Sequence, residues 1–167
     1  MKLPIIALAC GFVLATDALK ADAPSVPEGD QHVAHLTQQL NDFESAINLF
    51  KRCINQDRPT VETVNALNVL ADNFDRLCAH VLQFYVWAKS ENTAGKLQFE
   101  FSPAALEQLR DLYIRINTVM QDEVKEVADT LKQKPQYTRD PAIEAVGQRI
   151  VVSWNTLKTF KEQVDKQ

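Results

Sequence analysis

The sequence predicts an all-α protein, folded as an antiparallel, up-down-up-down four-helix bundle. Apolar residues recur every three or four positions over long stretches, which is the spacing that places them on one face of a helix. Residues that break helices are scarce, since the 167 residues include 4 glycines and 7 prolines. The apolar fraction of 46% and the charged fraction of 24% are ordinary for a globular chain, so we expect one domain with a substantial core.

The N-terminus has the composition of an export signal. Residues 1–15 combine a positive start with an apolar run that is too short to span a bilayer. We expect cleavage of residues 1–18, with residue 23 as the latest boundary, and a flexible arm over residues 19–29. Lipid attachment at Cys10 is a less favoured alternative because few apolar residues precede it. The mature chain is therefore expected to be exported, either secreted or periplasmic, and to lack a transmembrane segment.

The bundle domain is expected over residues 30–167, and its first helix has the clearest pattern. Asp30 can cap a helix that continues to about Gln56. Seven apolar residues in this helix are spaced alternately three and four apart: Val33, Leu36, Leu40, Phe43, Ile47, Phe50 and Ile54. This seam, as we call the seven residues, predicts a helix that packs lengthwise against other helices.

The second helix is expected over about residues 61–90, directly after the first. Pro59 interrupts the first helix and Thr60 can cap the next one, so the two helices should form a tight antiparallel hairpin. In the following segment, residues 91–101, apolar and polar residues alternate, which favours an extended chain lying against the end of the bundle. The apolar residues of this alternation are Leu97, Phe99 and Phe101.

The third and fourth helices are expected to begin at residues 102–103 and 140–141, where Ser or Asp directly precedes Pro. The third continues to about Leu131, and its apolar stripe has one irregular step near Glu123. The stripe of the fourth helix is regular except for the polar Ser153. Four helices joined by short connections give the predicted up-down-up-down bundle.

Charge and motifs exclude several classes of function. The net charge of −4 provides no basic face for the phosphates of a nucleic acid. The sequence contains no Gly-x-Ser-x-Gly elbow, no His-Glu-x-x-His pair and no phosphate-binding glycine loop. It also lacks the Glu-x-x-His pairs of di-iron bundles and the Cys-x-x-Cys-His of covalent haem sites. We therefore expect neither an enzyme nor a cofactor.

Three histidines and a cysteine fall at one level of the predicted hairpin and include the residue types that bind metal ions. They are His32, His35, Cys78 and His80. The seam turns His35 away from the core, and His80 lies about 200° around the helix from Cys78, so these side chains do not converge. We therefore predict no metal site.

The two cysteines beyond the export signal are expected to stay unpaired within one chain. Cys53 lies close to the hairpin turn and Cys78 lies far from it, an offset of roughly 20 Å along the helices at 1.5 Å per residue. A disulfide requires Cα atoms within about 7 Å. A bond between Cys53 residues of two chains is left open.

The candidate functional residues lie near the end of the second helix. Residues 81–88 are apolar nearly all round, and Val86 and Trp87 are predicted to point away from the packed face, toward the side that carries His80. Two interpretations follow. Either the loop residues Leu97, Phe99 and Phe101 fold over Val86 and Trp87 and complete a core, or the aromatic patch is exposed to a partner.

These observations favour an exported, non-enzymatic bundle protein that binds a protein partner, as a secreted or periplasmic interaction factor or inhibitor. The first alternative is a carrier of a lipid or another hydrophobic small ligand. The second alternative is a small extracytoplasmic enzyme or a haem-binding or metal-binding bundle.

Overall fold

The computed structural model describes residues 26–164, apart from the side chains of residues 98, 120, 121 and 161–164. Within these residues the chain forms six α-helices, one 3-10 turn and one π-helical segment, and no strand. The all-α class predicted from the sequence is confirmed. The predicted export signal over residues 1–18, the alternative lipid site at Cys10 and most of the predicted arm lie outside the described residues.

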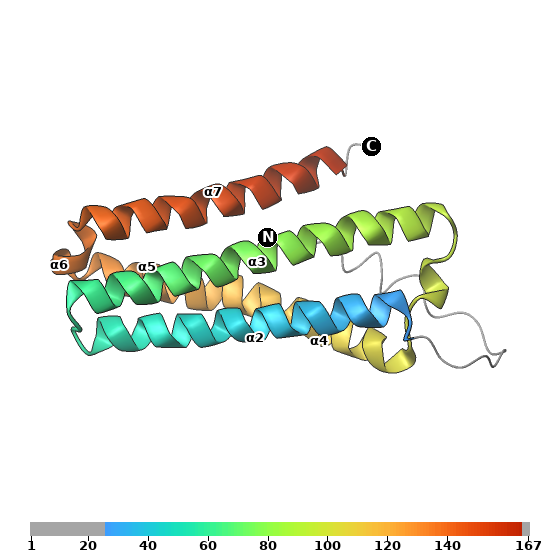
Figure 1. Ribbon diagram of the computed structural model, residues 1–167, viewed down its shortest axis with the longest axis horizontal. Coiled ribbons are helices and arrows are strands. Elements are labelled where there is room, and N and C mark those ends of the chain that lie inside the picture. The colour runs from blue at the N-terminus through green and yellow to red at the C-terminus, as the bar shows by residue number, and fades with distance from the viewer. Residues whose placement is uncertain (1–25, 165–167) are drawn as a thin grey trace.

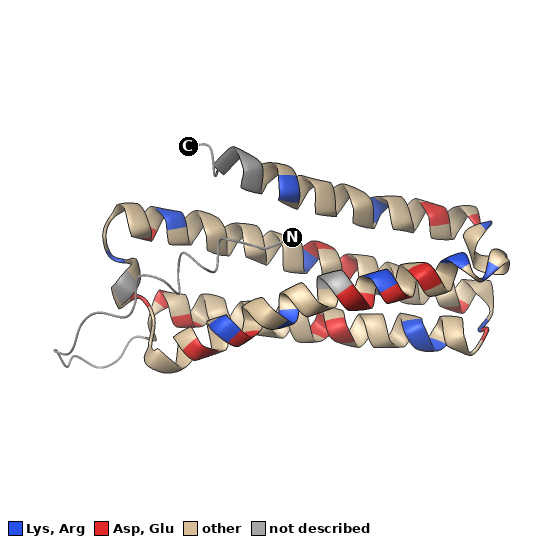
Figure 2. Cartoon of the chain, turned by 180° about the vertical axis from the view of Figure 1, so that it is seen from behind, with Lys and Arg blue, Asp and Glu red and all other residues tan. Residues whose placement is uncertain are grey.

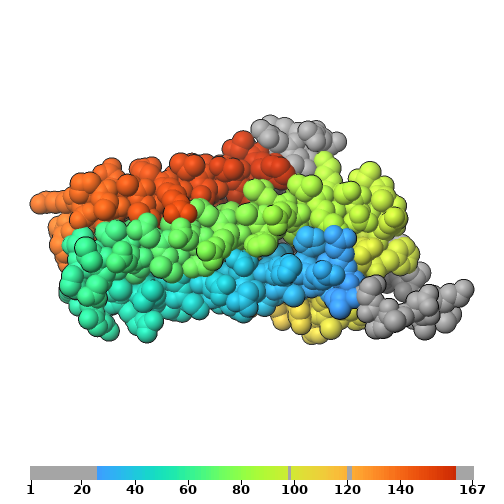
Figure 3. Space-filling model, in the orientation of Figure 1, coloured from blue at the N-terminus to red at the C-terminus, as the bar shows by residue number. Residues whose placement is uncertain are grey.

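The two longest helices, α2 (Glu28–Asn55) and α3 (Thr60–Thr93), form the predicted antiparallel hairpin. A third helical stretch, α4 (Pro103–Thr118) and α5 (Val124–Lys132), packs against α2. The last helix, α7 (Pro141–Val164), lies along α3, and on the face seen in Figure 3 α3 separates it from α2 (Figures 1 and 3). Since α7 has no comparable contact with α5 among the described residues, one side of the helical assembly is loosely closed.

The seam of α2 forms the centre of the core. All seven seam residues are at most 2% exposed, as the spacing predicts. On α3 the matching buried residues include Leu67, Ala71 and Phe74, and the rings of Phe43 and Phe74 lie 5.3 Å apart across the hairpin. Burying a large apolar side chain contributes about 1.5–3 kcal/mol, so this hairpin supplies much of the driving force for folding.

A π-helical segment, η2 (Val119–Glu123), joins α4 to α5 and accounts for the irregular step near Glu123. The buried stripe passes from Val119 to Val124, a step of five residues where an α-helix would use three or four. The backbone N–H of Val124 donates to the carbonyl of Val119, which is the i to i+5 hydrogen bond of a π-helix. The extra residue keeps both halves of the stripe facing the core.

Two of the four predicted helix caps are confirmed and two are wrong. Ser102 accepts a hydrogen bond from the Ala105 N–H at 3.2 Å, and Asp140 accepts one from the Ala142 N–H at 2.8 Å. Asp30 does not cap α2, which begins at Glu28 after Pro27, and Thr60 does not cap α3, where Pro59 takes that position. Proline fits this position because its ring favours the extended conformation found at Pro59, with φ −49° and ψ 143°, while its carbonyl accepts a hydrogen bond from the Thr63 N–H.

The segment after α3 is a turn, and the predicted extended chain is wrong. Residues Leu97–Phe99 form the 3-10 turn η1, which follows Gly95 with its positive φ of 71°. Leu97 and Phe101 are buried, whereas Phe99 is 68% exposed. The apolar and polar residues alternate here because Leu97 and Phe101 point into the core, whereas Phe99, midway between them, lies in solvent.

The N-terminus of α2 holds this segment in place. Asp30 accepts a hydrogen bond from the Ser102 N–H at 2.8 Å, so its carboxylate ties α2 to the start of α4. Gly29 is buried and lies so close to the segment that an added Cβ would stand 2.2 Å from the Glu100 carbonyl and 2.7 Å from the Phe101 ring. Only glycine fits this approach without displacing its neighbours.

A short helix absent from the sequence prediction, α6 (Pro135–Thr138), fastens the other end of the molecule. The Tyr137 hydroxyl donates to the Arg58 carbonyl at 2.6 Å, and Lys134 pairs with Asp57 at 2.5 Å. Asp57 adopts a positive φ of 49° in the turn between α2 and α3.

Within the part of the chain that the structure describes, no helix combines the length and the hydropathy that a membrane span requires.

Replacing Gly29 with Ala is expected to reduce the free energy of unfolding by about 1–3 kcal/mol, the usual cost of overpacking. The new methyl group would push the Glu100–Phe101 backbone off α2. Chemical denaturation measures the change, and Gly147→Ala is the matched control because no atom lies within 4 Å of a Cβ added there. Equal or greater stability of the Gly29→Ala variant would contradict the close packing described here.

Candidate functional site

An apolar cavity of about 420 Å³ lies between the hairpin, α5 and α7. Its floor is formed by the middle of the hairpin: Phe43, Ile47 and Phe50 on α2, and Leu67, Leu70 and Phe74 on α3. Its walls come from the two later helices: Val124, Val127, Ala128 and Leu131 on α5, and Ile143, Gly147, Ile150, Val151 and Trp154 on α7. We call this space the apolar cavity.

The cavity follows from how α7 is placed. The inner stripe of α7 packs on α3, but Ile150, Trp154 and Leu157 are only half-buried because α5 does not close over them. Val151, on the wall, is 50% exposed, so the cavity communicates with solvent. Gly147 also widens it, since the place of its missing side chain is open space.

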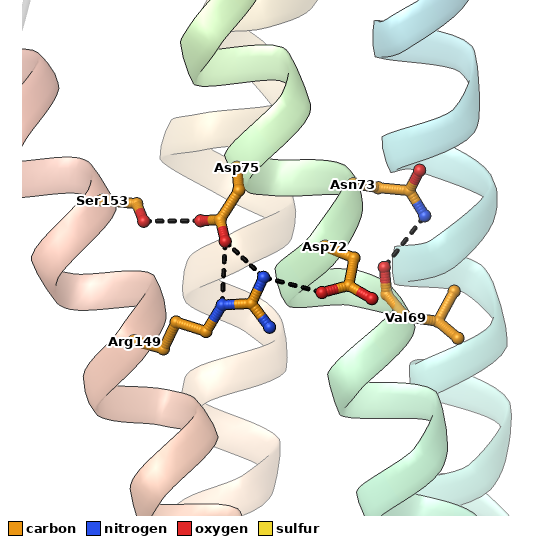
Figure 4. A network of polar contacts seen from close by, with 6 residues as sticks. All are labelled: Val69, Asp72, Asn73, Asp75, Arg149 and Ser153. Carbon is orange, nitrogen blue, oxygen red and sulfur yellow. Dashed lines mark hydrogen bonds and ion pairs between the residues drawn. The ribbon is translucent and has the colours of Figure 1, made fainter.

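A polar network fixes α7 on α3. Figure 4 shows Arg149 reaching from α7 to two carboxylates of α3, with its guanidinium 2.7 Å from Asp72 and 2.8 Å, through Nε, from Asp75. The Ser153 hydroxyl donates to the second oxygen of Asp75. The hydrogen bonds that Arg149 donates, first to Asp72 and second to Asp75, raise its pKa above the ordinary value. Ser153, the one polar interruption of the fourth stripe, was the sequence signal for this network.

The charges on the α5 side are also paired. Lys51 of α2 lies 2.6 Å from Glu126 and 3.8 Å from Glu123. Acidic and basic residues are interspersed along the helices on the face in Figure 2, and no large area of one sign is visible there. Lys51 and Arg149, which neighbour lining residues in the sequence, therefore already have two carboxylate partners each.

The predicted outward direction of Trp87 is wrong. Trp87 is half-buried between α2 and the segment after α3, with its ring 4.6 Å from His32, 5.7 Å from Phe101 and 5.8 Å from Phe84. Phe101 packs on Trp87 and Leu97 is buried, so the core-completing arrangement is met in part, although two of its members, Val86 and Phe99, stay exposed. The hairpin register turns Trp87 toward the first turns of α2, a consequence that helix periodicity alone does not reveal.

The other candidate residues of this region are not gathered around Trp87. Val86 is 55% exposed and Phe99 is 68% exposed, so both remain at the surface. His80 lies instead beside His35, with ring centroids 6.1 Å apart. Among the described residues no group of three or more His, Cys, Asp or Glu side chains is arranged to hold a metal ion.

The two cysteines are separate thiols, Cys53 half-buried and Cys78 buried. Burial, with a smaller contribution from the charge of Asp75, raises the pKa of Cys78 to about 12. Cys78 is therefore a protonated core residue at neutral pH and a poor nucleophile.

His32 makes the stability of the fold sensitive to acid. Burial lowers its pKa below the ordinary value of 6.5, His35 and His80 lower it further, and Glu28 opposes the shift. The unfolded chain therefore takes up this proton at a higher pH than the folded chain does. Stability from His32 is complete above pH 6.5 and decreases as the pH falls toward the lowered pKa of the folded state.

The urea concentration at the denaturation midpoint is expected to decrease when the pH is lowered from 7.5 to 5. The His32→Gln variant is expected to show a weaker dependence of this midpoint on pH. Urea titrations at several pH values measure both effects. Val152→Gln, at an exposed position of α7, is the control because it leaves all three histidines in place. An unchanged slope in His32→Gln would show that other groups cause the acid sensitivity.

Comparison with protein-family models, curated proteins and solved structures finds no match to this chain. No site residue is therefore supported by a relative. The geometry of the described residues is what bears on function, and its most developed feature is the apolar cavity.

Proposed function

We propose that the protein binds a small hydrophobic molecule in the apolar cavity, as a non-enzymatic carrier. The observation that carries this proposal is the cavity itself, about 420 Å³ of space lined by apolar side chains and Gly147. Small-molecule sites are typically concave, mostly apolar and about 300–1,000 Å³ in volume. We also propose that the protein is exported, as the composition of residues 1–18 predicts.

Packing considerations support the proposal. Protein interiors are close-packed, with few voids larger than a water molecule. A space of this size, lined mainly by Phe, Leu, Ile and Val side chains from four helices, leaves much apolar surface in contact with solvent. A hydrophobic ligand would remove that surface from water, at a gain of about 25 cal/mol per Å².

The arrangement of the helices supports access for a ligand. In this proposal the chain is an up-down-up-down four-helix bundle that is open along the side between α5 and α7. The α7 helix contacts α3 and α6, and the ion pairs of Arg149 join it to α3. These ion pairs therefore do not lie across the open side between α5 and α7.

The chemistry of the lining supports binding without turnover. None of the residues that line the cavity is a nucleophile, a carboxylate or a histidine. General acid–base and nucleophilic catalysis both need such groups at the reacting atoms. The apolar cavity is suited to hold a molecule and release it unchanged.

Filling the cavity is expected to abolish binding without harming the fold. Gly147→Leu places a side chain in the open space beside Gly147, and it should weaken binding of the uncharged dye Nile red by more than about tenfold, since Leu and the dye compete for one volume. Fluorescence titration measures the affinity, and thermal unfolding checks the fold.

Gly147→Ala is the matched control for this test. It brings the same gain in helix propensity, about 1 kcal/mol, with little added volume. It should bind Nile red like the unmodified protein. Failure of the unmodified protein to bind the dye, or equal binding by Gly147→Leu, would refute the proposed carrier function.

A second candidate is the docking of a protein partner at the end of the bundle. One observation favours it: Phe99, at the tip of η1, is 68% exposed although its neighbours Leu97 and Phe101 are buried. Exposed aromatic residues of this kind often anchor protein interfaces. The partner proposal thus centres on Phe99 and the exposed Val86, with Trp87 as a supporting core residue.

Phe99→Ser is expected to abolish capture of such a partner from the source organism and to leave the unfolding temperature nearly unchanged, because Phe99 is 68% exposed. Affinity capture with quantitative mass spectrometry provides the measurement. Ile114→Ser, at an exposed position of α4, is the control. A partner retained equally by both variants would exclude Phe99 as the anchor.

A further inference from the structure

We propose that the ligand of the apolar cavity is an uncharged molecule, such as a long-chain alcohol, an ester or a hydrocarbon, and not a fatty acid anion. This inference rests on the proposed carrier function. Three features of the described residues support it: the chemistry of the lining, the charges beside it and the one polar group that the lining side chains contain.

The lining provides no partner for a carboxylate. Apart from Gly147, its residues are aliphatic or aromatic, and none has a cationic or hydroxyl-bearing side chain. A carboxylate that enters such a space loses its hydration and gains no charged hydrogen bond in return. The ionised form of a fatty acid would therefore be selected against inside the cavity.

The charged residues beside the cavity do not provide a partner for a carboxylate either. Lys51 directly follows the lining residue Phe50 and is paired with both Glu123 and Glu126. Arg149 directly precedes the lining residue Ile150 and is paired with both Asp72 and Asp75. Because each of these two cations already has two carboxylate partners, neither offers an unneutralised charge to an incoming anionic headgroup.

The indole N–H of Trp154 is the one polar group on the lining side chains. It is a donor without an acceptor function, so it suits the oxygen of an alcohol, an ester or a ketone. A carboxylate could also accept this hydrogen bond, but a single neutral donor does not replace its hydration. The donor thus adds selectivity for a weakly polar, uncharged group.

The test compares two ligands of equal chain length, dodecanol and dodecanoate, at pH 8, where the carboxylate is ionised. The chain has two tryptophans, Trp87 and Trp154, so in a Trp87→Phe background the emission comes from Trp154 on the cavity wall. Dodecanol is expected to shift the Trp154 emission in a saturable way. Dodecanoate is expected to bind at least tenfold more weakly.

A charge reversal tests the contribution of the flanking carboxylates. Glu126→Lys removes one partner of Lys51 and adds a cation, so it should strengthen dodecanoate binding severalfold and leave dodecanol binding unchanged. Glu107→Lys makes the same change in net charge at an exposed position of α4 that does not line the cavity, and it should alter neither affinity.

The outcomes separate this inference from the function on which it rests. Equal or tighter binding of dodecanoate, with Nile red binding intact, would overturn the uncharged ligand and leave the carrier function standing. Absence of any response to Nile red and to both ligands would refute the carrier function. A dimer that dissociates in Gly147→Leu would place a second copy in the cavity and contradict both.

Discussion

The antiparallel packing of α2 on α3 is the constraint on which the rest of the structure depends. The α2 seam is almost fully buried, and the longer later helices each pack on one member of this hairpin. The α4–α5 stretch lies on α2, while α7 lies on α3. The hairpin also provides the floor of the cavity, so the register that aligns Phe43 with Phe74 sets the shape of the site as well as the core.

The peripheral elements are positioned by charged side chains at a few points. Asp30 holds the start of α4, Asp57 holds the residues before α6, and Arg149 holds α7. Ion pairs at the surface typically contribute at most about 1 kcal/mol each. Such contacts select an orientation without adding much stability, which would suit the wall of the proposed ligand-binding cavity.

Local patterns in the sequence predicted the helices well because the 3.6-residue period is a property of each segment alone. The same patterns could not predict the cavity, which depends on the separation of α5 from α7. They also misplaced Trp87, because its surroundings come from α2 and the turn after α3. Two local signals did point toward the site: Ser153, which interrupts a buried stripe, and Gly147, a residue without a side chain in the interior of a helix.

The π-helical segment separates the composition of the cavity wall from the exact length of the chain. In a regular α-helix, one residue gained or lost turns everything beyond it by about 100° around the helix axis. The π-helical turn absorbs such a change: without one residue of η2, Val119 and Val124 would stand four positions apart, which is the α-helical step, and Val124, Val127 and Leu131 would still face the cavity. The hydrocarbon wall of α5 is therefore kept whether or not η2 holds its extra residue.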